Sequence, residues 1–227
     1  MKYKWLMFDA DGTLFDFDRS EYATLETTFK QFGLVFEPPY AQVYREIDDQ
    51  IWQDIEAGKI QMEGLRTERF KLFFDAISIE AKCDDFSERY MNNLATAIDL
   101  IEGAEEILSR LFEETKMILI TNGPGDVQRS RVSKSTIGGY FMDVVISDEV
   151  GASKPDSRIF DEAFKRMSNP NKDEVLIIGD SLSSDMRGGY EYGIDTCWFN
   201  PGRCVNDLDV ECNYEIAALS DLLDIVE

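Results

Sequence analysis

The sequence predicts an α/β protein: a Rossmann-like parallel sheet core with helices on both faces, plus an inserted all-helical domain. From residue 103 onward, short apolar strands alternate with helical stretches, a pattern typical of a parallel sheet covered by helices. Between residues 16 and 98, apolar positions recur at spacings of three and four, without a strand pattern. We therefore expect residues 1–15 and 99–227 to form the core and residues 16–98 to form the helical insert.

The individual elements follow from the same patterns, taken in chain order. The apolar run Trp5–Phe8 predicts the first strand of the core. Insert helices are expected over residues 19–33, 39–57, 61–78 and 84–97, with breaks at Pro38-Pro39 and Gly58. Further core strands are expected over residues 116–121, 143–147, 175–179 and 195–199. Core helices are expected over residues 103–114, 125–135, 156–168 and 183–192.

Two acids follow the first predicted strand directly, in the segment Asp9-Ala10-Asp11-Gly12-Thr13. Residues two apart in an extended chain point to the same side, roughly 6–7 Å apart, so both acids can face one small site. Such a pair suits chemistry in which one carboxylate attacks and the other moves protons. Gly12 permits a sharp turn and leaves room for a ligand. The same segment can also be a plain turn or a helix cap, so it does not decide the function alone.

The second strand of the core is also followed by polar residues. Thr121, Asn122 and Gly123 stand where the apolar run 116–121 ends. We expect the helix that starts near Gly125 to point its first backbone N–H groups at an anion held there. A turn without any ligand would have the same residues.

A lysine and two further acids complete the pattern. Lys154 precedes Pro155, which keeps the lysine out of the helical region and suits the first turn of a helix. Asp180 follows the apolar run 175–179, and Asp185 lies about one turn into the next predicted helix. Alone, these residues could be a solvated cation and a helix cap. Their shared place at the carboxyl ends of predicted parallel strands favours one common site, because ligands bind at that edge.

The order and spacing of these segments resemble the haloacid dehalogenase-like (HAD) superfamily of phosphotransferases over the whole chain. The stretches Phe8–Phe17, Gly179–Gly189 and Gly193–Pro201 are similar to the YjjG-type pyrimidine 5′-nucleotidases within it. The resemblance implies that the helical insert is a cap that closes over the active site. Most of the many aromatic residues in the insert are expected to fill its core, and some could stack on a nucleobase.

The resemblance also implies roles for the acids. Asp9 would attack phosphorus and form an aspartyl-phosphate. Asp11 would protonate the leaving alkoxide and then take a proton from the attacking water. Mg²⁺ would be held by Asp9, by the backbone carbonyl of Asp11 and by Asp180, since hard oxygen ligands suit this ion. Thr13 would help to orient the nucleophile.

Further roles are implied for the remaining residues of the pattern. Thr121 and the N–H group of Asn122 would grip phosphoryl oxygens, while Lys154 neutralises charge during transfer. Asp185 would orient Lys154 or a metal-bound water. The residues expected to contact the substrate are Gly12, Thr13, Phe17 and Gly123, with Phe17 lining the pocket beside the acids.

The composition restricts the class of function. The chain has no histidine, which excludes imidazole acid–base chemistry and Ser-His-Asp triads. Its four cysteines lack C-x-x-C spacing and are expected to be reduced structural thiols. A net charge of −22 argues against binding nucleic-acid polymers, whereas Mg²⁺ and Lys154 can offset it locally for a small phosphorylated ligand. We find no signal peptide or membrane-spanning segment and expect a cytoplasmic location; the oligomeric state is left open.

We therefore expect a Mg²⁺-dependent phosphatase that hydrolyses small phosphomonoesters, with pyrimidine nucleoside 5′-monophosphates as the expected substrates. One alternative is a phosphatase or mutase that acts on sugar phosphates or phosphoglycolate. Another is a catalytically silent module that binds a phosphorylated ligand. A dehalogenase is disfavoured, because the dehalogenases of this superfamily need no metal and usually lack the second acid, here Asp11.

Overall fold

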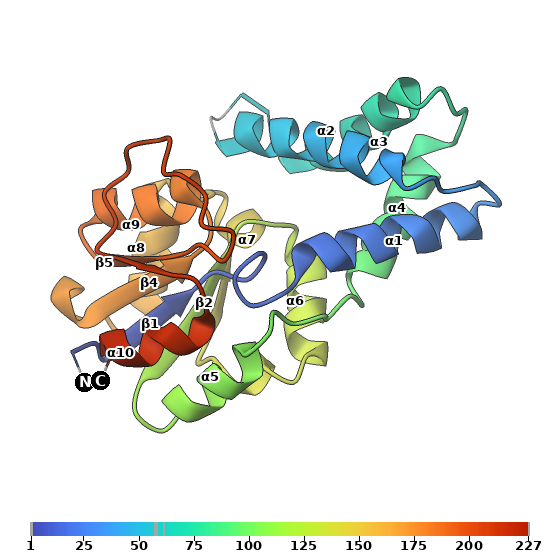
Figure 1. Ribbon diagram of the computed structural model, residues 1–227. Helices are drawn as coiled ribbons and strands as arrows, with labels where there is room; N and C mark the ends of the chain where they lie inside the picture. Colours follow the sequence, from blue (N-terminus) through green and yellow to red (C-terminus); the bar gives the residue numbers. More distant parts are fainter. Residues whose placement is uncertain (1, 57–58, 61, 227) are drawn as a thin grey trace. The chain divides into compact units, whose positions relative to one another are not determined.

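The chain forms two compact units (Figure 1). The computed structural model describes residues 2–56, 59–60 and 62–226. The core unit comprises Met1–Phe17 and Ile98–Glu227, and the helical unit comprises Asp18–Ala97. The expected helix boundaries at residues 57 and 61 and the expected break at Gly58 lie outside the described residues.

A six-stranded parallel sheet forms the centre of the core unit, in the order β3-β2-β1-β4-β5-β6. Its strands are β1 (Trp5–Phe8), β2 (Lys116–Thr121), β3 (Val144–Ile146), β4 (Val175–Gly179), β5 (Asp195–Phe199) and β6 (Tyr214–Ile216). In register, Phe8 at the end of β1 lies beside Leu119 of β2 and Ile178 of β4. The strand order reverses at β1, and ligands of open α/β sheets bind at such a switch point. The α/β fold class is confirmed.

Helices cover both faces of this sheet (Figure 1). They are α5 (Ala104–Leu111), α6 (Gly125–Lys134), α7 (Ser147–Val150), α8 (Ser157–Arg166), α9 (Arg187–Tyr192) and α10 (Leu222–Val226). Between them lie the short helices η1 (Gly138–Tyr140), η2 (Lys172–Glu174), η3 (Leu182–Met186, a π-helix) and η4 (Leu219–Asp221).

The sheet separates two hydrophobic cores because successive side chains of a strand point to opposite faces. Leu6 and Phe8 enter the core that α5 and α10 complete. Trp5 and Met7 enter the other core, which α8 completes through side chains such as Phe160. Each strand of the centre is buried on both faces, which explains its uninterrupted apolar sequence.

The helical unit packs around aromatic side chains. Its helices are α1 (Phe17–Gln31), which begins in the core unit, α2 (Pro39–Glu56), α3 (Met62–Ala76) and α4 (Cys83–Leu94). The fully or almost fully buried aromatic residues are Phe29, Tyr44, Phe70, Phe73, Phe74, Phe86 and Tyr90. Four other Phe rings, all buried or half-buried, have their centroids within 6.0 Å of the centroid of the Phe29 ring. The expectation that most aromatic residues fill the core of the insert is therefore confirmed for these seven.

Two parts of the fold differ from the prediction. The segment after Pro201, where no helix or strand was expected, contributes the edge strand β6 and helix α10 to the sheet and its cover. The expected helix 183–192 begins instead as the π-helix η3 and becomes α-helical only at Arg187. No helix among the described residues is long and apolar enough to cross a membrane.

Candidate active site

The predicted polar residues meet at the carboxyl ends of the central strands. Asp9 continues β1, and its backbone N–H donates to the carbonyl oxygen of Ile178 in β4 at 2.9 Å. Thr121 ends β2, and Asp180 directly follows β4. Parallel strands in register bring these ends to one edge of the sheet, so residues more than 100 positions apart share one site.

Lys154 lies buried among the acids and uses three donors there. Its Nζ donates to Oδ1 of Asp9 at 2.5 Å, to Oδ1 of Asp185 at 2.6 Å and to the carbonyl oxygen of Ile120 at 3.0 Å. Its side chain is 1% exposed. The backbone of Lys154 is held as well: its N–H donates to Oδ1 of Asn122 at 2.8 Å, and its carbonyl accepts from Nδ2 of Asn122 at 3.0 Å. The side chain of Asn122 therefore fixes the lysine, a role that the sequence did not predict.

Three carboxylates form a compact cluster beside this lysine. Oxygens of Asp9, Asp180 and Asp185 all lie within 4.8 Å of one another. Two glycines make room for the cluster. A Cβ atom at Gly12, whose φ is +81°, would lie 2.3 Å from Oδ2 of Asp180, and one at Gly179 would lie 2.3 Å from Cγ of Asp185. These glycines therefore belong to the construction of the site.

The electrostatics of the cluster favour a cation. Burial raises the pKa of Asp9, to which repulsion from Asp185 and Asp180 adds, while Lys154 opposes the change. Burial would lower the pKa of Lys154, but Asp185 and Asp9 outweigh it and raise that pKa. Burial and repulsion from Asp185 raise the pKa of Asp180 to about 7. Asp185 thus balances Lys154, and the charges of Asp9 and Asp180 remain to be compensated. Oxygen donors in this arrangement fit a hard divalent ion such as Mg²⁺.

Thr13, which was expected beside the acids, and Trp198, which was not, both contact Asp180. The buried hydroxyl of Thr13 donates to Oδ1 of Asp180 at 3.3 Å, so it contacts this acid, whereas the sequence suggested the nucleophile. The backbone carbonyl of Asp180 accepts from Nε1 of Trp198 in β5 at 2.8 Å. Asp185 is held in turn by the backbone N–H of Ser181, which donates to its Oδ2 at 3.2 Å.

Helix α6 contributes two side chains that the sequence did not single out. Arg131 donates to Oδ1 of Asp11 at 2.5 Å, and Gln128 donates to Oδ2 of Asp11 at 2.7 Å. Gln128 also donates to the hydroxyl of Thr121 at 3.0 Å. The spacing of three places both residues on one helix face, but many surface helices share this spacing, so it gave no distinctive signal.

The start of α6 differs from the expectation of an open anion site. The N–H of Gly123 donates to Oγ of Ser147 at 3.0 Å, and the N–H of Gly125 donates to Oδ2 of Asp148 at 2.9 Å. These donors are therefore occupied by α7, an element too short for the sequence to reveal. Phe17 lies at the start of α1, with its ring 5.9 Å from the guanidinium carbon of Arg131.

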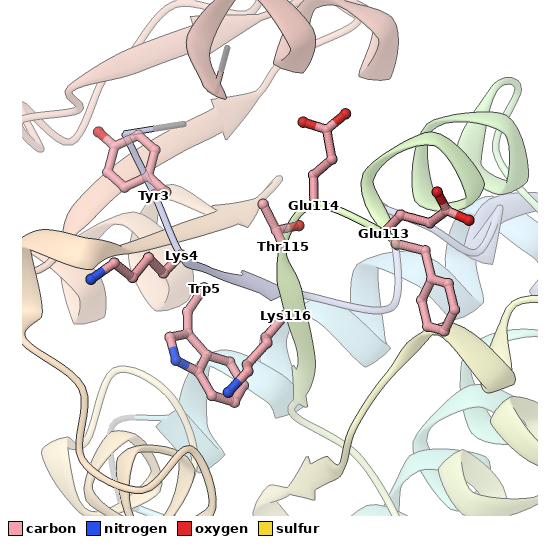
Figure 2. Close-up of a pocket in the computed structure, with 8 residues that line it drawn as sticks. Tyr3, Lys4, Trp5, Glu113, Glu114, Thr115 and Lys116 are labelled. Atoms are coloured by element: carbon pink, nitrogen blue, oxygen red, sulfur yellow. The ribbon is translucent and has the colours of Figure 1, made fainter.

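A separate hollow lies at the opposite edge of the sheet (Figure 2). It has a volume of about 700 Å³ and is lined by Tyr3, Lys4, Trp5, Phe112, Glu113, Glu114, Thr115 and Lys116. Both of its lysines have partners, because Lys4 pairs with Glu174 and Lys116 lies over the ring of Trp5. Its charges do not converge as they do beside Asp9, so the candidate site is the cluster at the carboxyl edge.

Comparisons with known proteins identify the family of this chain. The family model of haloacid dehalogenase-like hydrolases matches residues 6–199. The pyrimidine 5′-nucleotidase PynA of Streptococcus pneumoniae is 33% identical over 100% of this chain and 96% of its own length. The pyrimidine 5′-nucleotidase YjjG of Escherichia coli is 31% identical over 98% of this chain and 97% of its own length.

Solved structures show the same fold. The crystal structure of the HAD-hydrolase YfnB of Bacillus subtilis, bound to magnesium, is 30% identical and covers 100% of both chains with a TM-score of 0.94. An L-2-haloacid dehalogenase of Xanthobacter autotrophicus has a TM-score of 0.78 at 18% identity, which shows the fold alone. The resemblance to the HAD superfamily and to YjjG-type nucleotidases is confirmed. The chain belongs to the haloacid dehalogenase-like hydrolases.

Proposed function

We propose that this protein is a Mg²⁺-dependent phosphatase that hydrolyses nucleoside 5′-monophosphates, with a preference for pyrimidines. The observation that carries the proposal is the buried Asp9 held by Lys154, within 4.8 Å of two further carboxylates. The full-length similarity to two proteins named pyrimidine 5′-nucleotidases supports the substrate class. The net charge of −22 supports a small ligand over a nucleic-acid polymer. We further propose a cytoplasmic location.

The proposed metal ligands are the carboxylates of Asp9 and Asp180 and the backbone carbonyl of Asp11. A bound Mg²⁺ would neutralise phosphoryl oxygens and orient the phosphorus toward the nucleophile. Oxygens of Asp9 and Asp180 lie within 4.8 Å of each other and fit such an ion, and the magnesium-bound relative YfnB supports the choice. Asp185 holds Lys154 at 2.6 Å, which supports its role outside the direct ligands.

The chemistry proposed for the chain proceeds in two steps. A carboxylate oxygen of Asp9 forms a bond to phosphorus while the bond to the ester oxygen breaks, and Asp11 gives its proton to that oxygen. Water then attacks phosphorus, Asp11 takes a proton from it, and the bond between Asp9 and phosphorus breaks. Lys154 offsets the negative charge throughout, because its buried ammonium group already contacts Asp9.

Other residues would hold the substrate. We propose that Thr121 and the N–H of Asn122 bind phosphoryl oxygens, and that Gly12 and Gly123 let the substrate approach the backbone. Phe17 would line the pocket. We further propose that residues 16–98 act as a cap, a role supported by the interdomain movement described for YfnB.

The decisive experiment measures phosphate release from a panel of nucleoside monophosphates, sugar phosphates and phosphoglycolate, with Mg²⁺ and with a chelator. We expect release only with Mg²⁺, highest for pyrimidine monophosphates such as dUMP and dTMP. A maximum at sugar phosphates would retain the mechanism and overturn the substrate class. Absence of metal-dependent release from every compound would contradict the phosphatase proposal.

A further inference from the structure

The carboxylate of Asp11 is held on both oxygens by helix α6. Nη1 of Arg131 donates to Oδ1 at 2.5 Å, and Nε2 of Gln128 donates to Oδ2 at 2.7 Å. The two side chains also support each other, since Nη1 of Arg131 donates to Oε1 of Gln128 at 3.1 Å. This contact fixes which end of the Gln128 amide carries the donors. The carboxylate therefore has one defined orientation.

Gln128 connects two parts of the candidate site. The same amide nitrogen that donates to Asp11 also donates to Oγ1 of Thr121 at 3.0 Å. Gly123 leaves space for this arrangement, because a Cβ atom there would lie 3.0 Å from Nε2 of Gln128 and 3.1 Å from its Cγ. One side chain thus sets the spacing between the proposed acid and the hydroxyl proposed to bind the phosphoryl group.

Arg131 holds its position through burial and ring contacts. Arg131 is fully buried, and its guanidinium carbon lies 4.6 Å from the centroid of the Phe15 ring. Burying a guanidinium group is unfavourable unless it is paired, so its ion pair with Asp11 compensates a real desolvation cost. An arginine at the protein surface could pair with Asp11 without the desolvation cost of a buried guanidinium group. The burial of Arg131 therefore indicates that α6 is positioned to bind the Asp11 carboxylate.

We propose that Gln128 and Arg131 are positioning residues that fix the Asp11 carboxylate at a set distance from Thr121, and therefore from the reacting phosphoryl group. The inference rests on the proposed function, in which the ionised Asp11, as held here by Arg131 and Gln128, takes a proton from the attacking water in the second step. That proton is the one that Asp11 delivers to the ester oxygen in the first step of the next turnover. Proton transfer requires the acid within hydrogen-bond distance of the ester oxygen, and a displacement of about 1 Å can cost about 10²-fold in rate.

The test compares Gln128→Leu with the unmodified enzyme on two substrates. Leucine has a similar volume but no donors, so Asp11 and Thr121 lose their common partner. We expect kcat on dUMP, which has a poor leaving group, to fall about 10- to 100-fold, with KM changed less than about threefold. On p-nitrophenyl phosphate, whose leaving group needs little protonation, we expect less than about a threefold loss. Equal losses on both substrates would overturn the inference.

A double-mutant cycle shows whether Gln128 acts through Asp11. In an Asp11→Asn background, adding Gln128→Leu should change kcat on dUMP less than about twofold, because the acid is already absent. Losses that multiply would overturn the inference. If Asp11→Asn alone retained full activity on dUMP, the acid role in the proposed function would fail instead, so the two failures are distinguishable.

Two further variants control for folding. Ser133→Ala changes an exposed residue of the same helix and should leave both activities and the melting temperature unchanged. Arg131→Lys keeps the positive charge but loses the planar pair of donors, so it should reproduce the selective loss on dUMP in a protein that still melts cooperatively. Full activity of a folded Arg131→Lys enzyme on dUMP would remove Arg131 from the inference.

Discussion

Each unit of this protein contains a largely buried cluster of charged side chains, and the two clusters differ in their balance of acids and cations. The core cluster comprises Asp9, Asp180, Asp185 and Lys154, so three acids meet one lysine. The helical cluster comprises the buried Glu21, Asp48 and Arg69 together with Arg45, which is 44% exposed and also pairs with the exposed Asp18. Its two buried acids face two arginines, whereas three acids face one lysine in the core cluster. The first cluster is suited to receive a cation and the second is not.

The helical cluster shows how a buried arginine is accommodated without a ligand. Nη1 of Arg69 lies 2.6 Å from Oδ1 of Asp48, and both side chains are at most 5% exposed. The guanidinium carbon also lies 5.1–5.5 Å from the ring centroids of Tyr44, Phe70 and Tyr90. One ion pair and three aromatic rings thus compensate the buried charge of Arg69. The core cluster instead keeps its excess negative charge at the end of the sheet, which indicates function over stability.

Among the changes that distinguish the two clusters, Asp9→Asn in the core cluster is expected to have the largest effect, which is a loss of kcat. The amide has nearly the volume of the acid but cannot attack phosphorus, so kcat on dUMP should fall by about 10⁴-fold or more. The melting temperature should change little, because the substitution also removes a crowded negative charge. Substantial turnover by purified Asp9→Asn protein would contradict the nucleophile assignment.

Arg69→Met tests the helical cluster. Removing the arginine leaves Asp48 buried without its partner, and we expect the free energy of unfolding to fall by about 3–5 kcal/mol. Urea titration measures this loss. Because no metal is expected in this cluster, Mg²⁺ should raise the melting temperature of the variant by the same amount as that of the unmodified protein.

Lys154→Met is the matched change in the core cluster. Without metal, it should cost a similar 3–5 kcal/mol, since Asp9 and Asp185 lose their common cation. Mg²⁺ should restore more stability here than in the unmodified protein, because the ion then compensates three acids alone. An equal response to Mg²⁺ in Lys154→Met and Arg69→Met would contradict the difference between the clusters.

Metal binding by the unmodified protein is expected to have an intermediate effect. Mg²⁺ at about 100 times its dissociation constant should stabilise the folded state by about 2.7 kcal/mol. Thermal unfolding with Mg²⁺ and with chelator measures this difference. Asp180→Asn should remove most of it, whereas loss of an exposed acid such as Glu26 should not. An unchanged Mg²⁺ response in Asp180→Asn would exclude Asp180 as a ligand.

The last prediction concerns the pH dependence of stability through Glu21. Burial and repulsion from Asp48 raise the pKa of Glu21 to about 8, despite Arg45 and Arg69. The folded state therefore binds the proton more tightly than the unfolded chain. Stability is full below the unfolded pKa near 4.5 and decreases as the pH rises toward 8, by at most about 1.4 kcal/mol per pH unit.

Glu21→Gln should therefore flatten the pH dependence of the melting temperature between pH 5 and 8. Glu26→Gln, an exposed change on the same helix, provides the matched control and should retain the slope. A Glu21→Gln protein whose melting temperature falls with pH as steeply as that of the control would show that Glu21 ionises normally.

The sequence alone determined the fold class and the strand ends where the acids lie. Buried parallel strands leave uninterrupted apolar runs, and β1, β2 and β4 lie where those runs predict them. The residues at the ends of these strands share one edge by topology, which is why Asp9, Thr121 and Asp180 could be grouped before their contacts were known. Local pattern was sufficient because each signal is contained in a few consecutive residues.

The tertiary structure alone decided which side chains hold the reactive ones. Gln128 and Arg131 reach Asp11 across 117 and 120 residues, and Asn122 reaches the backbone of Lys154 across 32. The pairing of Arg69 with Asp48 likewise joins two helices whose polar residues look like ordinary surface positions. Such contacts depend on the packing of separate elements, and neither periodicity nor propensity of a segment contains that information.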